Sequence, residues 1–228
     1  MAQFVGVKAK PAQLRQIDND DVTEVSGLTL VLFKETSDLN ATGAVRSIFS
    51  VTDEGTPAAA AKTAKPAVKR RYDITSDTLV YKDAAHLATY TGVSAPVILK
   101  AGTDGNIEGA RIELRLAEAS RSLERLDASR SKDPRGDFTG PPVFATLEGG
   151  REARGDVLIY DALTGRYILR GKPLFLKTKE SDGSCSVSSG SEATFSKEGG
   201  DPQFPRESNP GGSSSEKKDC SLSIRAIK

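Results

Sequence analysis

Two stretches of the chain repeat each other, and this repeat restricts the possible folds more than any other feature of the sequence. Residues 77–92 read DTLVYKDAAHLATYTG and residues 156–171 read DVLIYDALTGRYILRG, aligned without a gap at an offset of 79 residues. Both contain Asp-x-Leu-apolar-Tyr followed by a Gly. A unit of about 80 residues made of short strands cannot bury its apolar face alone, so stacked copies should form one continuous, elongated structure.

A second element recurs three times and consists of a Gly with apolar residues three and five positions later. The copies are Gly27/Leu30/Leu32, Gly109/Ile112/Leu114 and Gly190/Ala193/Phe195. We interpret these glycines as corners or bulges where a strand turns. At the same spacing, the first copy of the Asp-x-Leu element would precede residue 1, so we expect the chain to begin within a repeat.

Apolar and polar residues alternate with a period of two between these elements. Ile112, Leu114 and Leu116 alternate with charged neighbours, a pattern typical of a strand with one buried face. The pairs Asp104-Gly105 and Thr164-Gly165 suit hairpin turns. We therefore predict an all-β fold with antiparallel sheets.

Composition excludes several classes of function. The 228 residues carry a formal net charge of +1 and one His, with 37% hydrophobic residues. A general nucleic-acid binder would have a basic excess, and a metal site of several histidines is impossible. His86 has no recognisable nucleophile or orienting group near it in sequence, as a catalytic base would need. We expect no enzyme activity, no cofactor, no metal and no nucleic-acid partner.

The termini and cysteines say less. The opening residues contain no apolar stretch of the length that a secretory signal needs, and no run approaches a membrane span. Cys185 and Cys220 form either a disulfide, which would suit an oxidising compartment, or two unrelated thiols.

The order of the motifs along residues 20–196 resembles a known family. The motifs are Ser76-Asp77-x-Leu79-x-Tyr81, Ala88-x-Tyr90-x-Gly92, Gly109-x-x-Ile112-x-Leu114, Leu126-x-Ala128, Ala153-x-Gly155-Asp156-x-Leu158-x-Tyr160 and Leu169-x-Gly171-x-Pro173. In order and spacing they resemble the OstA/LptA-like family, the periplasmic jellyroll domains of lipopolysaccharide export found in the A, C and D components.

The resemblance implies a fold and a function. It implies a twisted β-jellyroll, open at both ends, with an apolar groove that holds the acyl chains of lipopolysaccharide. It also implies a periplasmic location, no catalysis, and partner jellyrolls joined end to end by edge-strand pairing, with self-association as one form of it. The chain departs from the family pattern in its long polar insertions and in the missing Gly after Leu126-x-Ala128.

The predicted organisation follows from the resemblance and from composition. We expect a partial first repeat at 1–55, an Ala/Lys/Pro-rich linker or insertion at 56–71, jellyroll repeats at 72–198 with an insertion at 131–142, and a flexible segment at 199–218. The alternation of Leu222, Ile224 and Ala226 predicts a strand at 219–228, added to an exposed edge and tied through Cys185.

Seven residues are predicted to face a common interior: Leu79, Tyr81, Ile112, Leu114, Leu116, Leu158 and Tyr160. They are candidates for the wall of a lipid groove, and the alternative is the filled core of a purely structural scaffold. Lys62, Lys65, Lys69, Arg70 and Arg71 form a basic cluster, which is either a solvated linker or a contact for lipid phosphates.

Overall fold

The computed structural model describes residues 1–18, 21–53, 68–102, 105–118, 122–180, 182–197, 199–209 and 213–227. Residues 56–67 of the predicted linker, with Lys62 and Lys65, lie outside the described residues, as do residues 210–212 of the segment predicted to be flexible.

The described chain is built from antiparallel strands, which confirms the all-β prediction. Its helices are three short 3-10 turns, η1 (Asp83–Ala85), η2 (Glu148–Gly150) and η3 (Ile224–Ala226). None of the described helices is long and apolar enough to cross a membrane.

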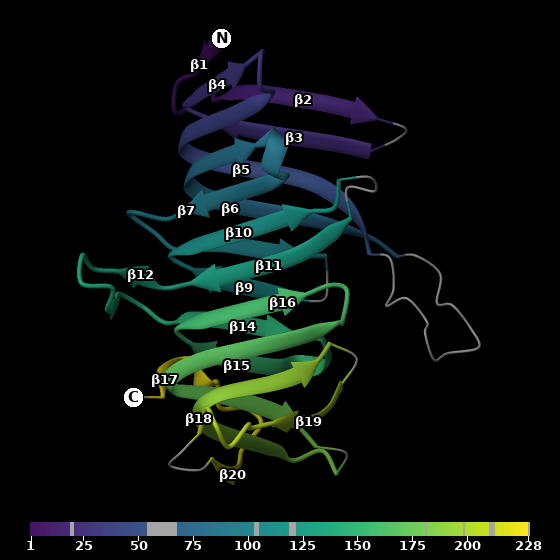
Figure 1. Ribbon diagram of the computed structural model, residues 1–228, viewed down its shortest axis with the longest axis vertical. Helices are drawn as coiled ribbons and strands as arrows, with labels where there is room; N and C mark the ends of the chain where they lie inside the picture. The colour runs from purple at the N-terminus through teal and green to yellow at the C-terminus, as the bar shows by residue number, and fades with distance from the viewer. Residues whose placement is uncertain are drawn as a thin grey trace.

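The strands stack as rungs in two faces along the long axis of the molecule (Figure 1). The first face contains, in order of pairing, β1 (Ala2–Val5), β4 (Thr29–Phe33), β5 (Asp38–Asp53), β6 (Val68–Lys82), β7 (Leu87–Thr91), β10 (Arg111–Leu116), β11 (Leu123–Ser129), β16 (Val157–Asp161), β17 (Arg166–Lys179), β18 (Cys185–Ser196) and β19 (Gly199–Gln203).

The second face shares β5, β6, β17 and β18 with the first. Its other strands are β2 (Ala12–Asp18), β3 (Asp21–Gly27), β8 (Val97–Ala101), β9 (Gly105–Gly109), β14 (Val143–Leu147), β15 (Arg151–Gly155) and β20 (Ser214–Lys218). β1 and β2 lie at one end of the stack, and β19 and β20 lie at the other (Figure 1).

The two faces meet at a corner where the recurring glycines lie. Gly27 ends β3 just before β4, and Gly109 ends β9 just before β10. Gly190 lies inside β18, between the part that pairs with β20 and the part that pairs with the start of β17. At each of these positions the chain leaves one face and enters the other.

The repeated Asp residues fasten the same corner. The Asp77 carboxylate accepts hydrogen bonds from the backbone N–H groups of Val93 and Ser94, both at 2.6 Å. Asp156 accepts from the backbone N–H of Lys172 at 3.3 Å and from Arg130 at 2.6 Å. Val93 and Lys172 are separated by the same offset as the two Asp residues, so the repeated sequence encodes a repeated corner contact.

One continuous apolar core fills the space between the faces. Its largest fully buried side chains are Leu30, Ile74, Leu99, Ile112, Leu114, Leu158, Leu169, Leu174 and Leu176. Burying a side chain of this size stabilises the fold by about 1.5–3 kcal/mol, so this layer holds the two faces together.

The predicted C-terminal strand at 219–228 is wrong. The added strand is β20 at Ser214–Lys218, within the segment predicted to be flexible, and it pairs with the start of β18. Alternation misled the prediction because Ile224 is buried while Leu222 is 60% exposed. β20 lacks apolar residues because an edge strand can be held by its backbone and kept soluble by charge.

Two other boundaries also differ from prediction. β6 begins at Val68, so the last four residues of the predicted linker belong to a strand. β19 occupies Gly199–Gln203 in the segment predicted to be flexible. The 131–142 insertion forms a small hairpin of β12 (Ser131–Lys132) and β13 (Phe138–Thr139), which projects from the stack (Figure 1).

A disulfide and two hydrogen bonds from Lys177 hold the C-terminal residues to the second face. Cys185 and Cys220 are bonded, with Cα atoms 5.1 Å apart. This is the pairing that the sequence left open. Lys177 donates to the carbonyls of Cys220 and Leu222, each at 2.7 Å.

The last turn is anchored by an apolar side chain, an ion pair, and hydrogen bonds with Glu152 and Arg154. Ile224 is buried against Phe144 and Val187 on the outside of the second face. Arg225 donates two hydrogen bonds to the Glu108 carboxylate, at 2.9 and 2.5 Å. The Arg225–Glu108 pair joins residues 117 positions apart.

Acid should release this last turn. The hydrogen bonds from Arg225 hold the pKa of Glu108 below its ordinary value of 4.5. A carboxyl group with a lowered folded-state pKa stabilises the fold above its unfolded pKa, and this contribution is lost as the pH falls through the folded value. We expect lower amide protection factors in residues 221–227 below about pH 4, measured by hydrogen–deuterium exchange and corrected for the intrinsic exchange rate at each pH.

Glu108→Gln provides the control, because its side chain has no charge to lose. It should show faster exchange of the same residues at pH 7 and a smaller change on acidification. The disulfide should keep β20 protected in both proteins. Equal pH dependence in the two proteins would contradict the assignment of the effect to Glu108.

Candidate functional site

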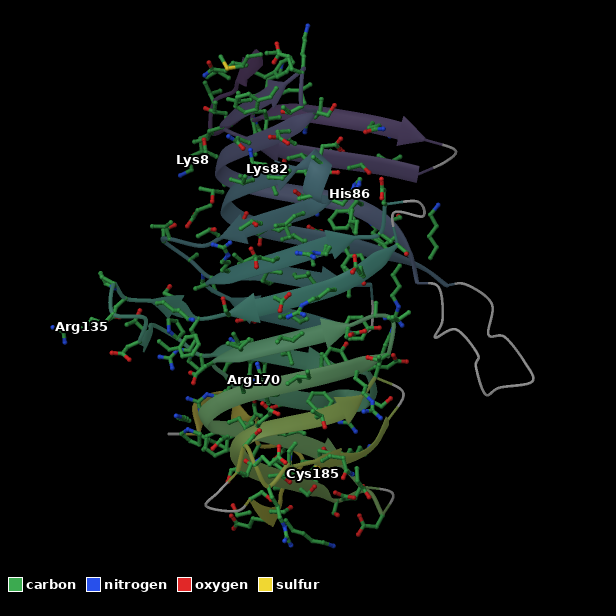
Figure 2. The ribbon with its side chains drawn as sticks, viewed as in Figure 1. Lys8, Lys82, His86, Arg135, Arg170 and Cys185 are labelled. Atoms are coloured by element: carbon green, nitrogen blue, oxygen red, sulfur yellow. A yellow bond between two sulfur atoms is a disulfide. The ribbon has the colours of Figure 1, made fainter. Side chains whose placement is uncertain are left out.

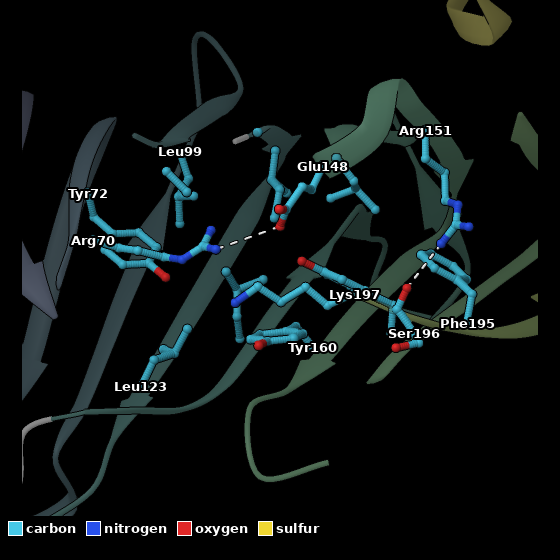
Figure 3. A pocket seen from close by; sticks show the side chains of 16 residues that line it. Arg70, Tyr72, Leu99, Leu123, Glu148, Arg151, Tyr160, Phe195, Ser196 and Lys197 are labelled. Atoms are coloured by element: carbon cyan, nitrogen blue, oxygen red, sulfur yellow. Dashed lines mark hydrogen bonds and ion pairs between the residues drawn. The ribbon is translucent and has the colours of Figure 1, made fainter. Parts of the chain in front are cut away.

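A groove lies between the two faces at the strand ends farthest from the corner, lined by residues of both faces (Figure 3). The second face contributes Arg70, Tyr72, Leu99, Ala101, Gly105, Ile107, Leu147, Glu148 and Arg151. The first face contributes Leu123, Leu126, Tyr160 and Tyr167, together with Phe195, Ser196 and Lys197 from the end of β18 and the turn after it. The groove therefore lies along the seam between the two faces, and it would close if the edges of the two faces came together.

One wall of the groove is a column of aromatic rings. Cross-strand pairing places Tyr160 of β16 opposite Tyr167 of β17, and Tyr167 opposite Phe195 of β18. The ring centroids of these two pairs are 4.7 and 5.2 Å apart. Such contacts contribute about 0.5–1.5 kcal/mol each beyond their buried area, so they stabilise this wall.

Basic side chains cross the groove above this wall. Arg70 approaches Glu148, with 3.7 Å between Nη2 and Oε2. The Lys197 ammonium lies 5.5 Å from the centroid of the Tyr160 ring, a cation–π arrangement. Both cations therefore border an apolar surface.

Arg151 is the most buried cation of the groove and is 8% exposed. Its two Nη atoms donate to the carbonyls of Ser196 at 3.0 Å and Gly200 at 2.9 Å. Its guanidinium carbon lies 5.2 Å from the centroid of the Phe195 ring. Burial lowers the pKa of Arg151, because water no longer solvates the charge.

The space enclosed by these walls is about 40 Å³. Pockets for small ligands span roughly 300–1,000 Å³, so a bulky ligand would enter only if the faces moved apart at the seam.

The seven predicted groove residues all face the interior between the two faces, at different depths. Leu79, Ile112, Leu114 and Leu158 are at most 2% exposed and belong to the packed core. Tyr81 and Leu116 are half-buried against that core, and Tyr81 donates its hydroxyl to Asp83 at 3.0 Å. Tyr160 lines the groove itself. Lipid binding by these residues stays a prediction.

The sequence pointed to fewer groove residues than the structure places there. Phe195 had a signal, because it ends the third copy of the Gly element, in the position that Leu114 holds in the second. Arg151 and Lys197 had none, since they are 46 residues apart and meet only through strand order. Of the basic cluster, Arg70 reaches the groove.

The described residues offer no group of His, Cys, Asp and Glu that could hold a metal ion. His86 lies at the turn after η1, where its backbone N–H donates to the Asp83 carbonyl at 2.9 Å. The groove presents apolar surface, aromatic rings and positively charged side chains.

Comparison with known proteins gives one structural match. No protein-family model and no curated protein sequence matches the chain. The structure is similar to the crystal structure of LptH, the LptA-homologous periplasmic component of the lipopolysaccharide transport device of Pseudomonas aeruginosa. The match has 14% sequence identity and a TM-score of 0.41, and it covers 55% of this chain and 76% of LptH.

Proposed function

We propose that this chain is a non-catalytic lipid-binding module that holds the acyl chains of lipopolysaccharide in the seam groove. The observation that carries the proposal is the groove itself, which is walled by apolar and aromatic side chains of both faces. The order of the sequence motifs, which resembles the OstA/LptA-like family, supports lipopolysaccharide as the lipid.

Acyl chains suit these walls for a simple energetic reason. Each methylene group moved from water to an apolar surface contributes about 0.8 kcal/mol. When an acyl chain separates the two faces, the protein loses some contacts between them, and contacts with the acyl chain replace these. No bond is made or broken, so the module can take up a lipid and release it again.

A transport bridge also needs ends that join to partners. Among the described strands, β1 pairs with β4 alone, and its Phe4 and Val5, together with Val7 just after it, are exposed. Unpaired backbone groups along such an edge recruit an added strand. We propose that this end, in a twisted β-jellyroll made of repeats and open at both ends, pairs with a neighbouring jellyroll of the bridge or with a second copy of this chain.

The disulfide supports a periplasmic location. Bonds such as Cys185–Cys220 persist in oxidising compartments, including the bacterial periplasm, and are rare in the cytosol. We place the module between the inner and outer membranes on this ground and on the motif resemblance.

A structural scaffold without a lipid is the second candidate. The observation that favours it is the tight interior, in which the largest leucines are fully buried and little enclosed space remains. In a scaffold, the aromatic column would only hold the faces together.

Photo-crosslinking with lipopolysaccharide distinguishes the two functions. Benzoylphenylalanine at Leu126 or Tyr167 would face the groove, and at the outward neighbours Arg125 or Arg166 it would face solvent. We expect crosslinked lipid from the two inner positions and none from the two outer ones. Crosslinking at the outer positions alone, or equally at all four positions, would contradict lipid binding in the groove. The structural scaffold would then be the remaining candidate function.

A further inference from the structure

The C-terminal residues lie on the outer surface of the second face in the way that a separate peptide would. Residues 213–227, here called the C-terminal segment, contain β20, which pairs with β18, and end in the turn η3. Hydrogen bonds and ion pairs join the segment to β9, β15 and β17 as well. Its buried Ile224 belongs to a small apolar cluster separate from the main core. The main core therefore does not depend on which chain supplies the segment.

The surface beneath the segment recognises two of its side chains. Ile224 is 1% exposed and packs against Phe144 and Val187. The next side chain, Arg225, donates to the Glu108 carboxylate at 2.9 and 2.5 Å, and its guanidinium carbon lies 4.2 Å from the centroid of the Phe144 ring. An aliphatic pocket beside a combined carboxylate and aromatic contact selects an aliphatic residue followed by arginine.

The same surface also holds the backbone of the segment. The Glu152 carboxylate accepts hydrogen bonds from the Ser223 hydroxyl and from the backbone N–H that follows it, both at 2.9 Å. Lys177 donates to two backbone carbonyls before this point, and Arg154 donates to the Ile227 carbonyl after it. The surface is therefore a peptide-binding site for a hydroxyl, an aliphatic and an arginine side chain in that order.

Charge and chain anchoring favour a second copy of the chain as the source of this peptide. Lys217 and Arg225 of the segment face Asp182 and Glu108 of the surface, and this attraction acts between two copies as it does within one. Asn209, just before the segment, is 4% exposed and hydrogen-bonded to the backbone of β18. The preceding chain can therefore stay in place when the segment moves to a neighbour.

We infer that this surface is a docking site for the C-terminal segment of a second copy, and that two copies exchange their segments reciprocally. An exchanged segment makes the same contacts as the chain's own segment, so the exchange costs little in contact energy. The joint lies on the outer surface and does not use the β1 edge or the lipid groove. It is thus independent of the proposed function.

The cysteines report which chain supplies the segment. Cys185 lies toward the end of the stack that contains β19 and β20 (Figure 2), and it bonds to Cys220 of the segment. In an exchanged pair, Cys185 of one copy would bond to Cys220 of the other. Forming this bond from two thiols transfers two electrons and two protons to an oxidant, for which oxidised glutathione serves.

Two full-length variants with one cysteine each test the exchange. The acceptor carries Cys220→Ser and Ile224→Asp, which weakens the hold of its own segment on the site. The donor carries Cys185→Ser and supplies an intact segment. We expect a covalent heterodimer when the two are mixed with oxidised glutathione, detected by electrophoresis without reductant. If the acceptor fails to fold, Ile224→Ala replaces Ile224→Asp in it.

Matched changes in the donor and the acceptor distinguish docking from random thiol oxidation. Ile224→Asp in the donor should lower the heterodimer yield about tenfold, because the buried pocket rejects a charge. Leu222→Asp, at a position that is 60% exposed, should leave the yield unchanged. Glu108→Arg in the acceptor should lower the yield about tenfold, and Arg225→Glu in the donor should restore it.

Two results would overturn the inference. Equal yields from all donors would show that the thiols meet by random collision, without docking. A mixture that forms no heterodimer would show that the segment stays on its own chain. Neither result bears on lipid binding in the groove, which the crosslinking experiment tests separately.

Discussion

Replacing Leu114 with Asp should unfold the chain or remove most of its stability. Leu114 is 1% exposed and lies between Ala88 of β7 and Leu126 of β11. The described core cluster around this position consists of hydrophobic residues, and an unpaired buried charge costs several kcal/mol. Because a domain is stable by only about 5–15 kcal/mol, we expect a loss of about 4 kcal/mol or more, measured by urea denaturation.

Two further variants make this result interpretable. Leu163→Asp places the same charge at a turn residue that is 66% exposed and should change stability by less than about 0.5 kcal/mol. Leu114→Ala should cost about 2–5 kcal/mol and remain measurable if Leu114→Asp does not fold. If Leu114→Asp denatures like the wild type, water reaches this position and the interior is an open channel.

Adding one methyl group at Gly155 should have the second-largest effect. A Cβ built on Gly155 would lie 2.6 Å from the carbonyl oxygen of Arg170, a backbone atom that cannot rotate away. The two segments would have to separate at the corner, where Asp156 also holds Lys172. Overpacking of this kind costs about 1–3 kcal/mol and occasionally more. We expect Gly155→Ala to lose about 3 kcal/mol in thermal or urea unfolding.

Gly136→Ala separates the close contact from the general effect of substituting a glycine. Gly136 is at the tip of the projecting hairpin with φ of +89°, and a Cβ there meets nothing within 4 Å. Its cost is then backbone strain alone, about 1–2 kcal/mol. Equal losses of stability at the two positions would show that the close contact at Gly155 does not add to the cost of the substitution.

The repeat made the corner predictable from the sequence. The recurring glycines predicted the corner, and the Asp-x-Leu-apolar-Tyr element predicted an inward Leu and Tyr in both copies. That the Asp of each copy holds the following turn is visible only in the structure. Strict alternation in residues such as Ile112, Leu114 and Leu116 specified strands because one face of each strand is buried. These are local signals, and local structure follows from them.

The groove was less predictable because no local signal defines it. Arg151 ends up beside Phe195 only after β17 has turned the corner and paired with both β15 and β18. Sequence spacing cannot report that path. β20 was missed for a related reason, since its ladder with β18 is made by backbone groups that any residue carries.

The four strands shared by both faces determine where the seam is best placed to open for the proposed lipid. β5 and β6 near one end, and β17 and β18 near the other, run unbroken around the corner apart from local register shifts. Between these pairs, each face is made of separate strands. For example, β15 ends in the second face and the next strand, β16, belongs to the first. The two faces are therefore joined by continuous strands toward each end and built from separate strands in the middle. If the seam opens for a lipid as we propose, we expect it to open first at mid-length.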